Sequence, residues 1–162
     1  MKTLIVFYSR SGRTKKVAKS IASQLKCDVE EIFDTKNRKG IPGFLSAGSD
    51  ANLKKLTIIK GIKKDPSLYD LVIIGTPVWS SNISAPIRTY IFLYKKELKK
   101  AAFFCTRLGT DAAKIFKDME SVSQKKPLAV LELTSGEVKR NLYTQKIKGF
   151  INKLKSKDYN EK

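Results

Sequence analysis

Runs of consecutive apolar residues, separated by segments with helical periodicity, dominate the pattern of this chain. Four runs are apolar and rich in β-branched or aromatic residues, as in strands buried on both faces of a parallel sheet. They are Thr3–Tyr8, Leu71–Gly75, Ala101–Thr106 and Leu128–Leu131. Cys27–Ile32 is more polar, which indicates an edge strand. The pattern therefore predicts a sheet of five strands.

Between these strands, apolar residues recur every three or four positions, and each such set predicts an amphipathic helix. Their members are Val17, Ala18, Ile21, Ala22 and Leu25; Ile87, Tyr90, Ile91 and Tyr94; Ala112, Ile115, Phe116 and Met119; and Tyr143, Ile147, Phe150, Ile151 and Leu154. Ser84 is placed to cap the second helix, with Pro86 in its first turn. Thr110 or Asp111 is placed to begin the third. The alternation of strand and helix predicts a doubly wound α/β fold with right-handed crossovers.

The segment from Asp34 to Tyr69 interrupts this alternation and is rich in glycine. We expect a short helix around Asn52–Leu56, and otherwise a loop or a small excursion over a ligand site. The chain as a whole reads as a single domain over residues 1–156. A polar tail at 157–162 is expected to fray.

Charge separates this chain from most proteins of its size. Its 162 residues include 33 Lys and Arg but only 15 Asp and Glu, for a net charge of +18. This charge predicts attraction to an acidic protein, a nucleic acid or an anionic membrane surface. The excess lies mainly in scattered lysines, whereas base reading and stacking favour arginine and aromatic residues. Specific nucleic-acid recognition is therefore not expected.

Several other classes are excluded by composition. The chain has no histidine, which excludes histidine-dependent catalytic triads and histidine-ligated metals. No apolar run is long enough to span a bilayer, and the N-terminal residues do not read as a signal peptide. We therefore expect a cytoplasmic protein.

The turn after the first strand has the composition of an anion-binding loop. It reads Ser9-Arg10-Ser11-Gly12-Arg13-Thr14 and leads directly into the first predicted helix. Free N–H groups and the helix dipole favour an anion at a helix N-terminus, and Gly12 permits close approach of a phosphate. The alternative is an ordinary turn capped by Ser9 or Ser11. The glycine-rich loops of nucleotide hydrolases and of dinucleotide-binding proteins are absent from the sequence.

This loop resembles the phosphate loop of the flavodoxins, which bind flavin mononucleotide (FMN). The pattern Ser9-x-Ser11-Gly12-x-Thr14 is similar to the family's Thr/Ser-x-Thr/Ser-Gly-x-Thr. After the third strand, Gly75-Thr76-Pro77-Val78-Trp79 is similar to the Gly-Thr-Pro-x-Trp loop of one branch of the family. After the fourth, Phe104-Cys105-Thr106-x-x-Gly109 takes the position of the second flavin-ring loop. The three segments come in the family's order, and the resemblance covers nearly the whole chain.

The resemblance implies a flavodoxin-like, five-stranded parallel sheet of order 2-1-3-4-5 in a three-layer α/β/α sandwich. All three loops then lie at the carboxyl edge of the sheet, where open α/β sheets bind ligands. The residues implied for the phosphate are Ser9, Arg10, Ser11, Gly12, Arg13 and Thr14. Those implied around the ring are Thr76, Pro77, Val78, Trp79, Thr106, Arg107, Leu108 and Gly109. Trp79 offers an aromatic face for stacking, and its alternative role is that of a core or interface anchor.

The implied strand order also bears on the cysteines. Cys27 on the second strand and Cys105 on the fourth would be about 14 Å apart, too far for a disulfide. We expect Cys105 to be a small buried residue rather than a nucleophile.

The function implied by the resemblance is electron transfer to a protein partner through non-covalently bound FMN, with the redox chemistry carried by the flavin. The alternative is an FMN-dependent oxidoreductase that uses NAD(P)H and a quinone, with the segment 34–69 as a lid. A flavin-free basic binding module is a third possibility.

The chain departs from typical flavodoxins, which are acidic. It places Arg10, Arg13 and Arg107 on the site loops. Positive charge near the ring stabilises the reduced flavin anion and raises its potential. We therefore expect an acidic redox partner protein and a potential that is not strongly low.

Overall fold

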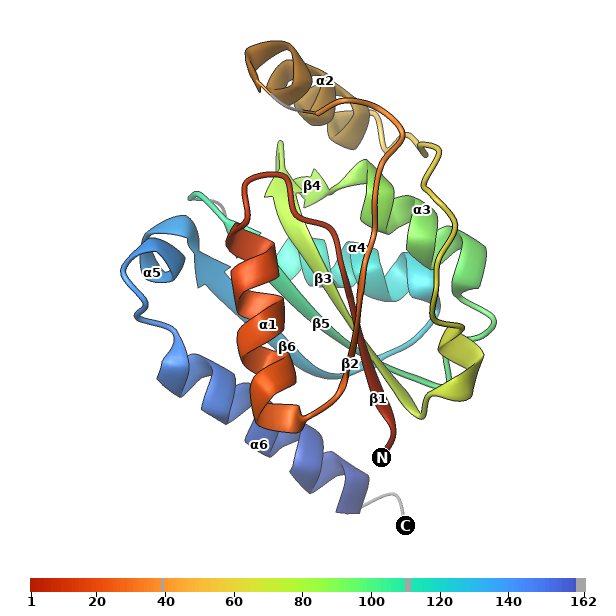
Figure 1. The fold of residues 1–162 in the computed structure, drawn as a ribbon, viewed down its shortest axis with the longest axis vertical. Coiled ribbons are helices and arrows are strands. Elements are labelled where there is room, and N and C mark those ends of the chain that lie inside the picture. The colour runs from red at the N-terminus through yellow and green to blue at the C-terminus, as the bar shows by residue number, and fades with distance from the viewer. Residues whose placement is uncertain (39, 110–111, 160–162) are drawn as a thin grey trace.

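A parallel sheet with helices on both faces organises the chain (Figure 1). The computed structural model describes residues 1–38, 40–109 and 112–159. The parallel strands run in the order β2-β1-β3-β5-β6, which is 2-1-3-4-5 when the five predicted strands are counted along the chain. Their bounds are β1 Thr3–Phe7, β2 Asp28–Glu31, β3 Leu71–Trp79, β5 Lys100–Arg107 and β6 Pro127–Thr134. The predicted fold class and strand order are confirmed.

One short strand was not predicted. β4 (Asn82–Ile83) pairs antiparallel with the end of β3, with Val78 opposite Ile83 and Trp79 opposite Asn82. Its tight turn holds Ser80 and Ser81 at positive φ. β3 therefore extends past the predicted Gly75 and carries Trp79 in a hairpin above the sheet.

Two apolar layers hold the sandwich together. On one face, α1 (Arg13–Leu25) and α6 (Thr144–Tyr159) pack on the sheet; on the other, α3 (Ala85–Tyr94) and α4 (Ala113–Ser123) do so. The central strands β1, β3 and β5 are buried on both faces because neighbouring positions along them enter opposite layers, as Ile5 and Val6 do. This double burial explains why the strands appear as continuous apolar runs in the sequence.

The prediction of a short helix around Asn52–Leu56 is wrong. The helix in this segment, α2, spans Gly40–Asn52, and residues 53–56 form a turn and a coil. A short 3-10 helix, Pro66–Leu68, follows before β3. In Figure 1, α2 lies beyond the carboxyl ends of the strands, above β3 and β4. The segment is thus an excursion over the edge of the sheet where ligands bind in such folds.

The predicted helix ends agree with the structure to different degrees. α3 begins directly after Ser84 with a proline in its first turn, but the Ser84 side chain makes no capping hydrogen bond. The predicted start of the third helix at Thr110 or Asp111 lies outside the described residues. α6 continues to Tyr159, three residues beyond the expected end of the domain at residue 156.

A capping box begins the short helix α5 (Ser135–Lys139) directly after β6. Thr134 Oγ1 accepts a hydrogen bond from the Glu137 N–H, and Glu137 Oε2 accepts one from the Thr134 N–H at 2.7 Å. Lys146 Nζ lies 2.7 Å from Glu137 Oε1. These contacts, with the Lys146 hydrogen bond the largest cause, lower the pKa of Glu137 from 4.5 to about 2.

We expect Glu137→Gln to lower the free energy of unfolding at pH 7 by about 1–2 kcal/mol, since one ion pair and part of the cap are lost and solvent screens the rest. A carboxyl group with a lowered folded-state pKa stabilises the fold above its ordinary pKa of 4.5, and this contribution is lost as the pH falls toward 2. Urea unfolding across this range should therefore show the gap between the parent and the variant closing toward acid. Glu120→Gln, at an exposed glutamate of α4, is the control; a gap that does not change with pH would contradict the prediction.

Candidate functional site

The loop after β1 meets the carboxyl ends of β3 and β5 at one cavity on this edge of the sheet. It is lined by Arg10, Ser11, Arg13, Thr14, Pro77, Val78, Trp79, Thr106, Arg107, Leu108 and Ser135. All of these except Ser135 are predicted site residues. We call this cavity the edge cavity. Its volume is about 60 Å³, whereas sites that enclose a small molecule measure about 300–1,000 Å³. A ligand of cofactor size would therefore lie partly outside it, with an edge exposed.

Four predicted site residues do not line the edge cavity. Ser9 and Gly12 lie on its phosphate-loop side and line neighbouring cavities. Gly109 lies exposed in the loop after β5. Thr76 is fully buried, and its Oγ1 accepts a hydrogen bond from the Ser84 N–H at 3.1 Å. The Thr76 side chain therefore anchors the start of α3 rather than facing the cavity.

The phosphate loop has the properties of an anion site. Gly12 precedes α1 with φ of +84°, and no side chain of the described residues makes a capping hydrogen bond there. Nothing in the described chain lies within 4 Å of the position that a Gly12 Cβ would take. The N-terminus of α1 is therefore open to a ligand, and its N–H groups and dipole favour an anion. The ordinary capped turn, with Ser9 or Ser11 as the cap, is not what the structure shows.

Ser9 adds a second, independent observation. Its Oγ is buried, yet it finds no hydrogen-bond partner among the described residues. A buried hydroxyl without a partner is unfavourable, and in folded proteins such groups are usually satisfied by a side chain, a water or a ligand. Ser9 belongs to the loop that leads into α1, so an anion bound by this loop is a candidate partner for the hydroxyl.

Thr14 and Thr106 join two of the site loops. Their Oγ1 atoms lie 2.8 Å apart, and both side chains are buried. Thr14 belongs to the first turn of α1 and Thr106 to the end of β5. This hydrogen bond fixes the phosphate loop against the second ring loop, so the two predicted halves of the site are held in register.

The indole of Trp79 forms one wall of the edge cavity. It is only 7% exposed, and it meets the ring of Tyr8 edge-on, with the ring centroids 5.5 Å apart. On the same ring, the Arg38 guanidinium carbon lies 5.6 Å from the centroid. Burial, the largest cause, raises the pKa of Tyr8 to about 12, so its phenol remains protonated at neutral pH. Trp79 is thus both packed against the protein and open to the cavity.

Sequence reasoning missed Tyr8, Arg38 and Ser135 as site residues. Ser135 was detectable, because the Thr134-x-x-Glu137 pattern directly after the last strand marks a capped helix start at the same edge of the sheet. The contact of Arg38 with Trp79 had no sequence signal, since the two residues lie far apart along the chain.

The edge cavity is electropositive. Its lining includes Arg10, Arg13 and Arg107, and no Asp or Glu among the described residues lines it. Arg107 Nε donates to Glu132 Oε2 at 3.0 Å, which offsets one of the three positive charges. A site with this balance favours an anionic ligand.

Neither cysteine lines the edge cavity. Cys27 and Cys105 are both free thiols. Burial raises the pKa of Cys105 to about 12, and the thiol therefore remains protonated at neutral pH and a poor nucleophile.

A second cavity, which we call the β2 cavity, lies across the phosphate loop from the edge cavity. Its volume is about 370 Å³, and its lining includes Tyr8, Ser9, Arg10, Phe33 and Lys60. Arg10 lines both cavities. The β2 cavity is within the size range of small-molecule sites.

Comparison with known proteins shows which solved structures share this fold. No protein-family model and no curated protein sequence matches the chain. Among solved structures, the chain is similar to a flavoprotein from Lactobacillus acidophilus NCFM in complex with FMN, at 27% identity and a TM-score of 0.69, covering 86% of this chain and 97% of that one. The apo-form of a flavoprotein from the same organism matches at 29% identity and a TM-score of 0.61, covering 85% and 95%.

A third similar structure is oxidised Flavodoxin 2 from Bacillus cereus, at 16% identity and a TM-score of 0.57, covering 97% of this chain and 99% of that one. The similarity thus extends over almost the whole of both chains. Among the described residues, no helix is long and apolar enough to cross a membrane.

Proposed function

We propose that this chain, a flavodoxin-like protein by its fold, binds FMN without a covalent bond and passes electrons to a protein partner. The observation that carries the proposal is the buried, unpartnered Ser9 Oγ in the loop that leads into the uncapped N-terminus of α1. A phosphate there would accept hydrogen bonds from Ser9, Ser11 and the backbone of α1. The FMN complex of the similar flavoprotein from Lactobacillus acidophilus supports the choice of ligand.

The chain's own residues would hold and orient the flavin ring. Trp79 supplies an aromatic wall, and the ends of β3 and β5 bring the two ring loops to the edge cavity. Bound FMN supplies one- and two-electron redox chemistry. The edge cavity is too small to enclose the ring, which leaves a ring edge exposed to a docking protein, an arrangement suited to electron transfer.

The electropositive site supports two further parts of the proposal. Arginines around the edge cavity stabilise a negatively charged reduced flavin, so we propose a midpoint potential above that of acidic flavodoxins. The net charge of +18 favours an acidic redox partner, whose association should weaken as salt is added.

A second candidate function is that of an FMN-dependent oxidoreductase that uses NAD(P)H and a quinone. The β2 cavity supports it, because this cavity is large enough for a small substrate and shares Arg10 with the edge cavity.

The first experiment is the absorption spectrum of the purified protein, followed by titration of the flavin-free protein with FMN and with riboflavin. Trp79 is the only tryptophan, so its fluorescence reports on the ring wall directly. The proposal expects stoichiometric quenching by FMN and weaker binding of riboflavin. No quenching by either flavin would overturn it.

Carrier and enzyme differ in what reduces the flavin. A carrier turns over only with a reductase protein, whereas an oxidoreductase oxidises NAD(P)H steadily with a quinone as the sole acceptor. Steady oxidation by the pure protein would favour the second candidate function over the first. A redox titration then gives the midpoint potential.

A further inference from the structure

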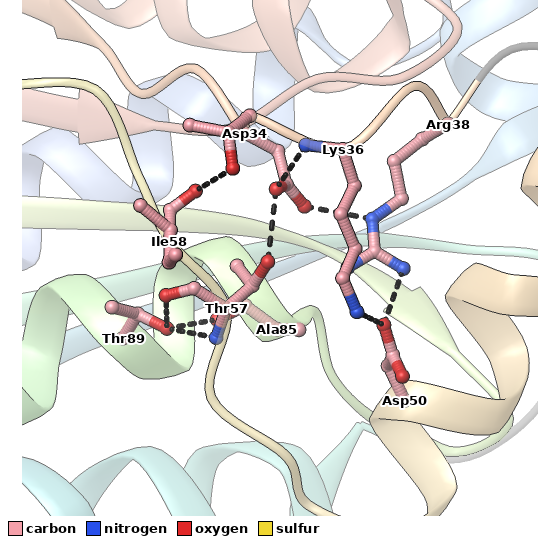
Figure 2. A network of polar contacts seen from close by, with 9 residues as sticks. Asp34, Lys36, Arg38, Asp50, Thr57, Ile58, Ala85 and Thr89 are labelled. Carbon is pink, nitrogen blue, oxygen red and sulfur yellow. Dashed lines mark hydrogen bonds and ion pairs between the residues drawn. The ribbon is translucent and has the colours of Figure 1, made fainter.

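A buried ion cluster joins the segment after β2 to helix α2 (Figure 2). Its centre is Arg38, which is 3% exposed. Arg38 Nε donates to Asp34 Oδ2 at 2.7 Å, and Nη1 lies 2.8 Å from Asp50 Oδ2. Lys36 Nζ donates to the same Asp50 oxygen at 3.1 Å. Two carboxylates thus neutralise two cations, in a chain that has only 15 acidic residues against 33 basic ones.

The cluster is anchored on α3. Asp34 Oδ1 accepts a hydrogen bond from Thr57 Oγ1 at 2.9 Å, and the Thr57 N–H donates to Thr89 Oγ1 at 2.9 Å. Thr89 lies within α3 and donates in turn to the Ala85 carbonyl at 3.0 Å. Figure 2 shows this chain of contacts running from α3 through Asp34 to Arg38. The guanidinium is therefore held from a rigid element of the sandwich.

Helix α2 is shaped to close around Arg38. A Cβ at Gly43 would lie 2.3 Å from the Arg38 carbonyl carbon, so only glycine permits this approach. A Cβ at Gly48 would lie 3.0 Å from Ser80 Oγ, in the turn after Trp79. Ala51 is fully buried on the same helix. α2 is thus seated between Arg38 and the hairpin that carries Trp79.

The Arg38 guanidinium also lies over the Trp79 ring, and Tyr8 meets the same ring edge-on. Trp79 is therefore held by a cation and by a second aromatic ring, while it still lines the edge cavity. We propose that Arg38 is a positioning residue of the ring site: it fixes the indole of Trp79, and through it the flavin ring, and ties this wall to α2. The part that concerns the flavin rests on the proposed function.

Lysine cannot take over this role. A guanidinium is planar and presents several donors in a fixed fork, so it can reach two carboxylates while it lies over an aromatic ring; an ammonium group is a compact point charge. Arg38→Lys keeps the charge that Asp34 and Asp50 require, and it thereby avoids leaving buried carboxylates without a cation. It removes the guanidinium group over the Trp79 ring and the fork of donors that reaches the two carboxylates.

The test compares the parent, Arg38→Lys and Lys36→Met. Lys36→Met is the matched control, because Lys36 pairs with Asp50 in the same cluster but is 52% exposed at its side chain. In the flavin-free protein, Arg38→Lys should strongly reduce the near-ultraviolet circular dichroism of Trp79 and lower its fluorescence anisotropy. FMN and riboflavin affinities should both fall by about tenfold, which leaves their ratio unchanged. Lys36→Met should leave all four readings close to those of the parent.

Three outcomes would overturn the proposal. They are an unchanged Trp79 signal in Arg38→Lys, an equal change in Lys36→Met, and a loss confined to FMN, which would place the action of Arg38 at the phosphate. If the parent binds neither flavin, the proposed function fails. The Trp79 signals of the flavin-free protein then still test whether Arg38 fixes the indole. If Arg38→Lys does not fold, Asp50→Asn loosens the hold on Arg38, and it should shift the same signals in the same direction by a smaller amount; no shift would overturn the proposal.

Discussion

Replacing Ser9 and Ser11 together by alanine should lower the affinity for FMN by at least about 100-fold and leave the affinity for riboflavin nearly unchanged. A hydrogen bond to a charged group contributes about 1.5–3 kcal/mol, so losing two from a phosphate removes about 3–6 kcal/mol. Riboflavin lacks the phosphate and does not depend on either hydroxyl. Titration of the double variant and the parent with FMN and with riboflavin, monitored by Trp79 fluorescence, measures both dissociation constants.

The structure gives this double substitution a low cost to folding. Ser9 Oγ has no partner among the described residues, and Ser11 Oγ accepts only a 3.3 Å hydrogen bond from Arg13 Nη1 at an exposed position. Unfolding of S9A/S11A should therefore match that of the parent. Ser156→Ala, at an exposed serine of α6 far along the chain from the loops, is the control for serine loss. An equal loss of riboflavin affinity would show that the serines support the ring site instead, and unchanged FMN affinity would place the phosphate elsewhere.

The central strands β1, β3 and β5 were predictable because they have no polar face. Ile5 and Val6 enter opposite apolar layers. A strand that packs against both layers must be apolar at every position, so it appears in the sequence as a continuous apolar run. The position of the site could be predicted from the sheet. All parallel strands end at one edge, and open α/β sheets bind ligands at that edge. The edge cavity is lined by residues from the loop after β1 and from the carboxyl ends of β3 and β5.

Helix α2 was not predictable from its own sequence. Gly40, Pro42, Gly43 and Gly48 are residues that weaken or break a helix, and they read as a loop. The helix forms because of its neighbours: Gly43 permits contact with the Arg38 backbone, and Asp50 pairs with the Arg38 side chain. Tertiary contacts outside the helix thus override its local preference.

The contacts between side chains within the site could not be predicted from the sequence for the same reason. The hydrogen bond between Thr14 and Thr106 and the contact of Arg38 with Trp79 each join segments that come together only in the folded chain. Thr76 shows the converse case, in which a residue that fits the resemblance in sequence turns its hydroxyl to Ser84 in the interior. A motif places a residue on a loop, but packing decides which way its side chain points.

Gly75→Ala should lower the free energy of unfolding by about 3 kcal/mol, with a drop in Tm of roughly 6–12 °C. Gly75 lies beside Phe104 where β3 pairs with β5, and a Cβ at Gly75 would lie 2.0 Å from Phe104 Cζ. Phe104 is itself fully buried, so its ring has no open space into which to move. The added methyl group must therefore push apart the two strands that carry both ring loops, and FMN affinity should fall with stability.

Phe104→Leu tests whether the ring is the cause. It costs stability on its own, but in the double variant it removes the atoms that meet the new methyl group, so Gly75→Ala should cost much less in this background than in the parent. Gly149→Ala is the matched control: no atom of the described chain would lie within 4 Å of its Cβ, and a glycine to alanine change inside a helix is neutral or stabilising. Thermal unfolding of the parent, Gly75→Ala, Phe104→Leu and the double variant measures the coupling. If the losses of stability in Gly75→Ala and Phe104→Leu simply add in the double variant, the steric contact with Phe104 is not the reason for glycine at this position. Another feature of Gly75 must then be required in β3.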